Sequence, residues 1–109
     1  MHVNIQDYSL GIPKVSENES FVIIECHSIA VTGTNLLNGN LYPMFYITNK
    51  NLFNLSQNGK KHITDFIGTN VATANLYKCE VYAFYLDGIT YFCSTKSPMW
   101  CNFNVIIKK

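Results

Sequence analysis

The chain contains 109 residues, which is enough for one domain and leaves little room for a second. Hydrophobic residues make up 48% of the chain, so it can build a core, and disorder is excluded as its main state. Only 14% of the residues are charged and the formal net charge is +1, against a charged fraction of about 25% in an average soluble domain. A surface with so few charges is poorly protected against association with other proteins.

The N-terminal third predicts two strands separated by a loop. Val3 and Ile5 alternate with polar residues and predict a short strand. Ser9 to Glu19 has the composition of a loop, and Ser20 to Thr32 predicts a long strand rich in β-branched residues. The alternation of the long strand slips near Glu25, which a β-bulge would explain.

A turn and another strand follow. Residues 38–40 (Asn-Gly-Asn) are a turn signal, and Leu41 to Thr48 predicts the strand after it. Pro43 has no backbone N–H, so this strand is expected to begin at a sheet edge or to carry an irregularity.

One segment predicts a helix, the run from Lys60 to Ile67. Ile63, Phe66 and Ile67 recur there at the i, i+3, i+4 spacing that is typical of the apolar face of a helix. Gly68 stands where a glycine would end such a helix. We therefore expect one short helix near residues 60–67.

The strongest local signal is a β-hairpin between Leu76 and Lys96. Asp87 and Gly88 suit a two-residue type I′ turn, because both central residues of that turn need positive φ. This turn places Phe84 opposite Tyr91. The other expected cross-strand pairs on that face are Tyr82 with Cys93 and Leu86 with Ile89.

The opposite face of this hairpin is also apolar, because the same register places Ala83 opposite Phe92 and Val81 opposite Ser94. A strand pair that is apolar on both sides has to be covered on both sides, by its own chain or by a neighbour.

The last segment, Trp100 to Lys109, alternates cleanly and predicts a half-buried strand. With the other strands it indicates an all-β, mainly antiparallel fold in a single domain over residues 1–109. We expect a β-sandwich or, alternatively, a small barrel, with the short helix near residues 60–67.

The cysteines indicate a reducing compartment. Cys26, Cys79, Cys93 and Cys101 form no C-x-x-C pair, which argues against a zinc knuckle or ribbon. No signal-peptide pattern and no membrane-spanning apolar run is found. We expect four buried free thiols in a protein made in a reducing cytoplasm, not secreted by a signal peptide and not membrane-bound, with a virion as its possible final location.

No catalytic constellation is visible. Cys26 and His27 are neighbours on a predicted strand, so they point to opposite faces and cannot act as a nucleophile and its base. Glu25 and Glu80 lie inside strong strands, and surface positions are favoured over a catalytic dyad. No metal-ligand spacing links the three histidines. We predict no catalytic, cofactor-binding or metal-binding residues, no cofactor and no small-molecule ligand.

A nucleic-acid partner is not expected either. All eight basic residues are Lys and none is Arg, so bidentate guanidinium contacts to phosphates or guanine are excluded. The chain also lacks a basic patch. Thirteen Asn residues, together with many Ile, Lys, Tyr and Phe, match an AT-rich coding sequence.

These exclusions leave protein association as the expected role. We expect a non-enzymatic structural or interaction subunit of a larger homo- or hetero-oligomeric assembly, specifically a phage or virus particle component such as a capsid decoration, connector or tail protein. The expected interface aromatics, on or beside the hairpin face opposite Phe84, are Tyr77, Tyr85, Phe92 and Trp100.

Two alternatives stay open. A small phage-encoded inhibitor or accessory protein that binds one host target would share this composition. An enzyme built on a sandwich would require the fold to bring Glu25, Glu80 or a histidine together in a pocket.

Overall fold

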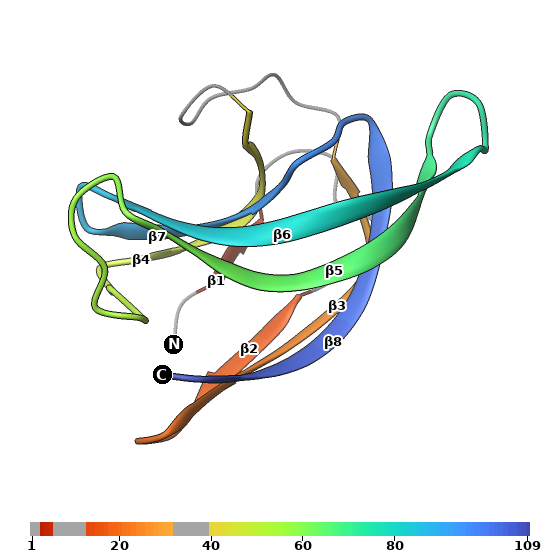
Figure 1. Cartoon of the computed structure of the whole chain (residues 1–109). Helices are drawn as coiled ribbons and strands as arrows, with labels where there is room; N and C mark the ends of the chain where they lie inside the picture. Colours follow the sequence, from red (N-terminus) through yellow and green to blue (C-terminus); the bar gives the residue numbers. More distant parts are fainter. Residues whose placement is uncertain (1–2, 6–12, 32–39) are drawn as a thin grey trace.

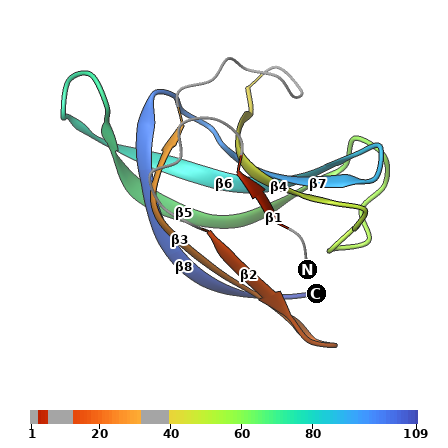
Figure 2. The same cartoon turned by 180° about the vertical axis from the view of Figure 1, so that it is seen from behind.

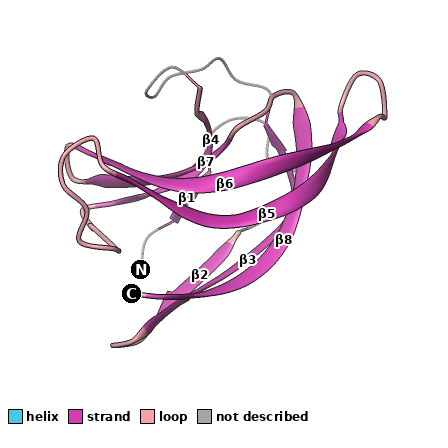
Figure 3. Cartoon of the chain, in the orientation of Figure 1, coloured by secondary structure: helices cyan, strands magenta, loops and turns pink. Residues whose placement is uncertain are grey.

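The computed structural model describes residues 3–5, 13–31 and 40–109, and these residues form an all-β structure without a helix (Figure 3). The described part therefore contains no helix that could cross a membrane. Its eight strands are β1 (Val3–Ile5), β2 (Lys14–Glu17), β3 (Phe21–Val31), β4 (Tyr42–Thr48), β5 (Lys60–Asn70), β6 (Leu76–Leu86), β7 (Ile89–Ser94) and β8 (Met99–Lys108).

All eight strands belong to one antiparallel sheet with the order β1-β4-β7-β6-β5-β8-β3-β2. The sheet bends over on itself, so that β4, β7, β6 and β5 face β8, β3 and β2 (Figures 1 and 2). The bend lies between β5 and β8, which pair only at Thr69–Trp100 and Asn70–Met99. β1 and β2 are the two edges of this order, so the described sheet is a half-barrel, and the predicted all-β sandwich or small barrel is confirmed.

The inner side of the bent sheet is the main hydrophobic core. Both halves of the sheet contribute to it, and the rings of Phe45 on β4 and Phe92 on β7 stack within it with 4.8 Å between their centroids. The largest of its other fully buried side chains are those of Ile24, Met44, Ile47, Met99, Val22 and Val81. The inner side is mainly apolar, with Thr90 and Ser94 as its buried polar residues, so closing the sheet over it removes apolar surface from water.

The predicted hairpin is confirmed as β6 and β7. Asp87 and Gly88 have φ angles of 48° and 83°, as the type I′ turn requires. Phe84 pairs with Tyr91, and the remaining pairs follow the predicted register from Val81–Ser94 to Leu86–Ile89.

Three other strands also follow the sequence prediction. The register of β3 against β8 shifts between Cys26 and Ile29, where a bulge was expected. The register of β4 shifts between Pro43 and Phe45, which is the expected irregularity at a residue without an N–H. β8 alternates between buried and exposed residues from Cys101 to Asn104.

The helix predicted near residues 60–67 is wrong, because this segment is the first part of β5. The register of β5 against β6 shifts between His62 and Thr64, so Ile63 is an extra residue in the strand. Such a bulge changes the phase of the alternation. Ile63 and Phe66 consequently both point into the core at a spacing of three residues, while Ile67 is exposed.

Gly68 does not end a helix but allows β5 to approach β8. A Cβ atom at this position would lie 2.8 Å from Met99 Cε and 2.9 Å from the backbone oxygen of Trp100. Only a residue without a side chain fits at this close backbone approach.

The N-terminal part differs from the prediction in one strand. β1 confirms the strand around Val3 and Ile5, whereas β2 lies inside the segment predicted as a loop. β2 is a short edge strand that begins with Lys14 and ends with Glu17. Charged residues at a sheet edge prevent pairing with other chains, but they also make the segment resemble a loop in the sequence. The turn expected at residues 38–40 falls largely outside the described residues.

All four cysteines are buried and none forms a disulfide, as predicted. Burial raises the pKa of the Cys26 thiol to about 12. Burial also raises the pKa values of Cys93 and Cys101. These thiols therefore stay protonated and unreactive while the sheet is folded.

The bulge in β5 predicts that two isoleucines, which a helix would bury together, contribute very differently to the free energy of unfolding. Ile63 is 4% exposed and Ile67 is 70% exposed. Ile63→Ala should lower the free energy of unfolding by about 2–5 kcal/mol, and Ile67→Ala should change it by less than about 0.5 kcal/mol. Denaturant unfolding of both variants measures the difference, and equal losses would contradict the bulge.

Thiol titration tests the arrangement of the cysteines. A disulfide-exchange reagent should find four thiols in the denatured chain under non-reducing conditions, because no cysteine is paired. In the native protein the reaction should be slow, since only the thiolate reacts. Two or fewer thiols after denaturation would show that disulfides form.

Candidate interaction surface

The outer side of the hairpin carries a second hydrophobic cluster, separate from the core. Its buried members are Phe84 on β6, Cys93 on β7, and Leu41 just before β4. Alternate residues of a strand point to opposite faces, so this cluster lies on the face opposite Ala83 and Phe92, which belong to the core.

Half-buried aromatic and aliphatic side chains surround this cluster. Tyr82, Leu86 and Tyr91 pack against it, and Tyr46 of β4 lies opposite Tyr91 with 5.7 Å between the ring centroids. We call Tyr46, Tyr82, Leu86 and Tyr91 the aromatic surface. The described strands form one sheet, so no second sheet within residues 13–31 and 40–109 covers it.

The aromatic surface is uncharged but has a cation at its border. Burial is the main cause that raises the pKa of Tyr91 above its ordinary value of 10.0, so its hydroxyl stays neutral at physiological pH. Lys60 Nζ lies 5.2 Å from the centroid of the Tyr82 ring, within range of a cation–π interaction. Apolar area with a polar border is the usual anatomy of a protein interface.

The outer face of β5 and β6 extends beyond the aromatic surface. His62, Asp65, Lys78 and Glu80 form a charged cluster next to Tyr82. Past this cluster, Ile67 and Leu76 are 70% and 69% exposed.

The structure separates the four aromatics that the sequence analysis proposed as interface residues. Phe92 is fully buried in the core, so the prediction that it lies at an interface is wrong. The sheet bends toward the hairpin face that carries Phe92, and this face therefore lies inside the molecule. Tyr77 is exposed near the start of β6, and Tyr85 and Trp100 are half-buried. A role for these three at an interface stays a prediction.

The titratable residues singled out from the sequence lie apart, with one exception. Cys26 is buried while His27 is exposed, as expected for neighbours on a strand. Glu25 lies on β3, opposite Lys14 of β2 and Asn104 of β8. Glu80 lies directly opposite Asp65, and His62 is close to both. No sequence pattern predicts this cluster, because the bulge in β5 creates it.

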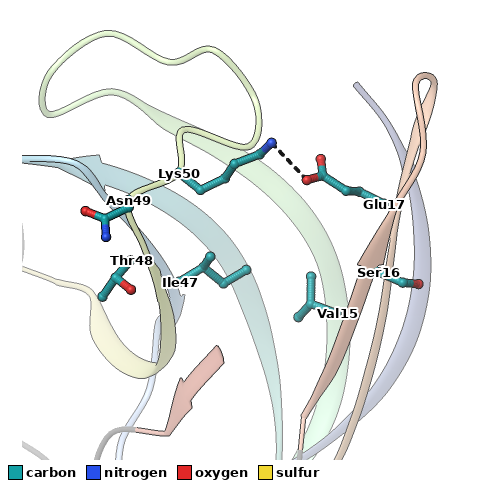
Figure 4. Close-up of a pocket in the computed structure, with 7 residues that line it drawn as sticks. All are labelled: Val15, Ser16, Glu17, Ile47, Thr48, Asn49 and Lys50. Carbon is teal, nitrogen blue, oxygen red and sulfur yellow. Dashed lines mark ion pairs between the residues drawn. The ribbon is translucent and has the colours of Figure 1, made fainter. Parts of the chain in front are cut away.

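A groove of about 520 Å³ lies between β2 and the end of β4 (Figure 4). Val15, Ser16 and Glu17 line one side of it, and the run 47–50 lines the other. Lys50 Nζ reaches across to Glu17 Oε1 at 3.0 Å. This ion pair joins the two halves of the sheet close to its open side.

Glu17 is also paired with Lys109, which follows β8. The hydrogen bond from Lys109 is the largest cause that lowers the pKa of Glu17 below its ordinary value of 4.5, and Lys50 lowers it further. The carboxylate is therefore ionised and engaged by two ammonium groups at neutral pH. It is a poor candidate for a general acid or base.

Comparisons of the chain with protein-family models, with curated proteins and with solved structures find no match.

The ion pairs of Glu17 predict an acid-sensitive contribution to stability. Because the folded-state pKa is lowered, the contribution is present above pH 4.5 and is lost as the pH falls through the lowered value. Glu17→Gln should lower the free energy of unfolding by about 1 kcal/mol at pH 7 and low salt, and the difference from wild type should shrink in acid.

Denaturant unfolding from pH 3 to pH 7 measures this difference, with the exposed neighbour Glu19→Gln as the matched control. A Glu17→Gln effect that is independent of pH, or that Glu19→Gln reproduces, would show that the ion pairs do not hold the sheet together.

Proposed function

We propose that this protein is a non-enzymatic subunit of a protein assembly and that it binds a neighbouring subunit through the aromatic surface. The observation that supports this proposal is the two-sided hairpin. Its inner face is covered by the chain itself, whereas its outer face is an apolar cluster bordered by half-buried tyrosines. A subunit seated there would complete the coverage that an apolar sheet face requires.

The simplest neighbour is a second copy of the chain. The net charge of +1 and the low fraction of charged residues leave little repulsion between copies. The same apolar face on two copies can pack against itself around a twofold axis. Tyrosine suits such contacts because its ring buries area while its hydroxyl remains able to bond with water.

The groove between β2 and β4 favours this role over an enzymatic one. Its lining offers one carboxylate, Glu17, which is already paired with Lys50 and Lys109.

Two features support the more specific proposal of a phage or virus particle component. The amino-acid composition matches an AT-rich coding sequence, and the surface carries few charges.

Association of the isolated protein tests the proposal. The mass in solution, measured by light scattering or sedimentation over a wide concentration range, should rise above that of one chain. Tyr91→Ser should weaken the association by about 2 kcal/mol or more, the usual effect of removing an aromatic anchor, which is roughly 30-fold in the dissociation constant.

Ile106→Ser is the matched control, since Ile106 is 66% exposed but lies outside the hairpin, on β8 opposite Ile23 of β3. It should leave the association unchanged. Circular dichroism melts should show that both variants remain folded. A wild-type protein that stays monomeric at high concentration would contradict assembly through copies, and the inhibitor alternative would then be favoured.

A further inference from the structure

We propose that His62, Asp65 and Glu80 form a binding site for a divalent transition-metal cation, with Zn²⁺ as the ion that fits them best. The site is on the outer face of β5 and β6, next to the aromatic surface. It does not depend on the proposed function.

The bulge in β5 creates this juxtaposition. His62 and Asp65 are three residues apart, so a regular strand would point them to opposite faces. The extra residue Ile63 turns inward and restores both to the outer face. Glu80 of β6 lies directly opposite Asp65 in the register, so the ligands come from two paired strands rather than from a loop.

The distances between the donor atoms suit a small cation. His62 Nε2 lies 2.8 Å from Asp65 Oδ1 and 3.9 Å from Glu80 Oε1, and one donor atom of each residue lies within 4.8 Å of the others. Zn²⁺ bonds to nitrogen and oxygen are about 2.0–2.2 Å long, so ligand atoms around a tetrahedral ion are about 3.3 Å apart. Small side-chain rotations therefore bring the three donors to this separation.

The charges of the cluster also favour a cation. Asp65 and Glu80 are like charges directly across the strand pair, an arrangement that destabilises a sheet. Lys78 partly offsets them, with its Nζ 3.9 Å from Asp65 Oδ2. A divalent ion between the two carboxylates would replace their repulsion by attraction to a shared centre and would compete with Lys78.

The chemistry of the donors selects the kind of metal. One imidazole with two carboxylates suits Zn²⁺ and similar first-row ions, whereas Mg²⁺ and Ca²⁺ prefer sites made of oxygen alone. The His62 ring packs edge-to-face on Tyr82 with 5.4 Å between centroids, which restricts its orientation. The three side chains are 44–47% exposed, so water has access to a fourth position.

Calorimetric titration of the folded protein with Zn²⁺ tests the site, together with the absorption spectrum of bound Co²⁺. We expect one ion per chain and a Co²⁺ spectrum without a thiolate charge-transfer band, because the cysteines are buried elsewhere. His62→Ala, Asp65→Asn and Glu80→Gln should each weaken binding by about tenfold or more, since even groups that only support a metal ligand typically cost that much. Mg²⁺ in excess should not displace Zn²⁺.

Two further variants separate this site from nonspecific binding or loss of folding. His27→Ala removes an exposed histidine on β3 and should leave the affinity unchanged. Lys78→Met removes the competing ammonium group and should tighten binding several-fold, an effect that unfolding cannot produce. The proposal is overturned if the wild type does not bind, if His62→Ala binds as tightly as wild type, if His27→Ala loses binding equally, or if a thiolate band is present.

Discussion

The hairpin of β6 and β7 is apolar on both faces, and the rest of the structure is arranged around the need to cover it. On the inner face, the sheet bends until β3 and β8 face the hairpin, and Ala83 and Phe92 belong to one core with apolar side chains of those two strands. On the outer face, Leu41 and the half-buried tyrosines pack against Phe84 and Cys93, and no second sheet among the described residues covers them. The chain itself thus covers the inner face of the hairpin. The incomplete cover of the outer face supports our proposal that a neighbouring subunit binds there.

A single extra residue in β5 connects the core to the outer face. The bulge turns Ile63 inward, where it fills the core, and at the same time points His62 and Asp65 outward to meet Glu80. The i, i+3, i+4 spacing of apolar residues around it is shared by a helix and by a bulged strand. Only the partner strand decides between the two, so neither β5 nor the cluster on it could be predicted from the sequence.

Strands whose structure is determined by neighbouring residues in the chain could be predicted from the sequence. The Asp87-Gly88 turn fixes the register of its hairpin by its own φ angles, and β8 shows its buried face by simple alternation. β2 could not be predicted, because a short charged edge strand resembles a loop. The inner position of Phe92 could not be predicted either, since both faces of the hairpin are apolar and only the bend of the sheet distinguishes them.

We propose that another subunit covers the outer face of the hairpin, whereas its inner face belongs to the core of the chain itself. Hydroxyl-radical footprinting of the protein in dilute and in concentrated solution measures side-chain exposure at each residue. We expect Tyr82, Leu86 and Tyr91 to become protected as the concentration rises, while Ile106 keeps its reactivity and Phe92 is protected at every concentration. Unchanged reactivity of the three outer residues, or protection centred on Ile106, would contradict it.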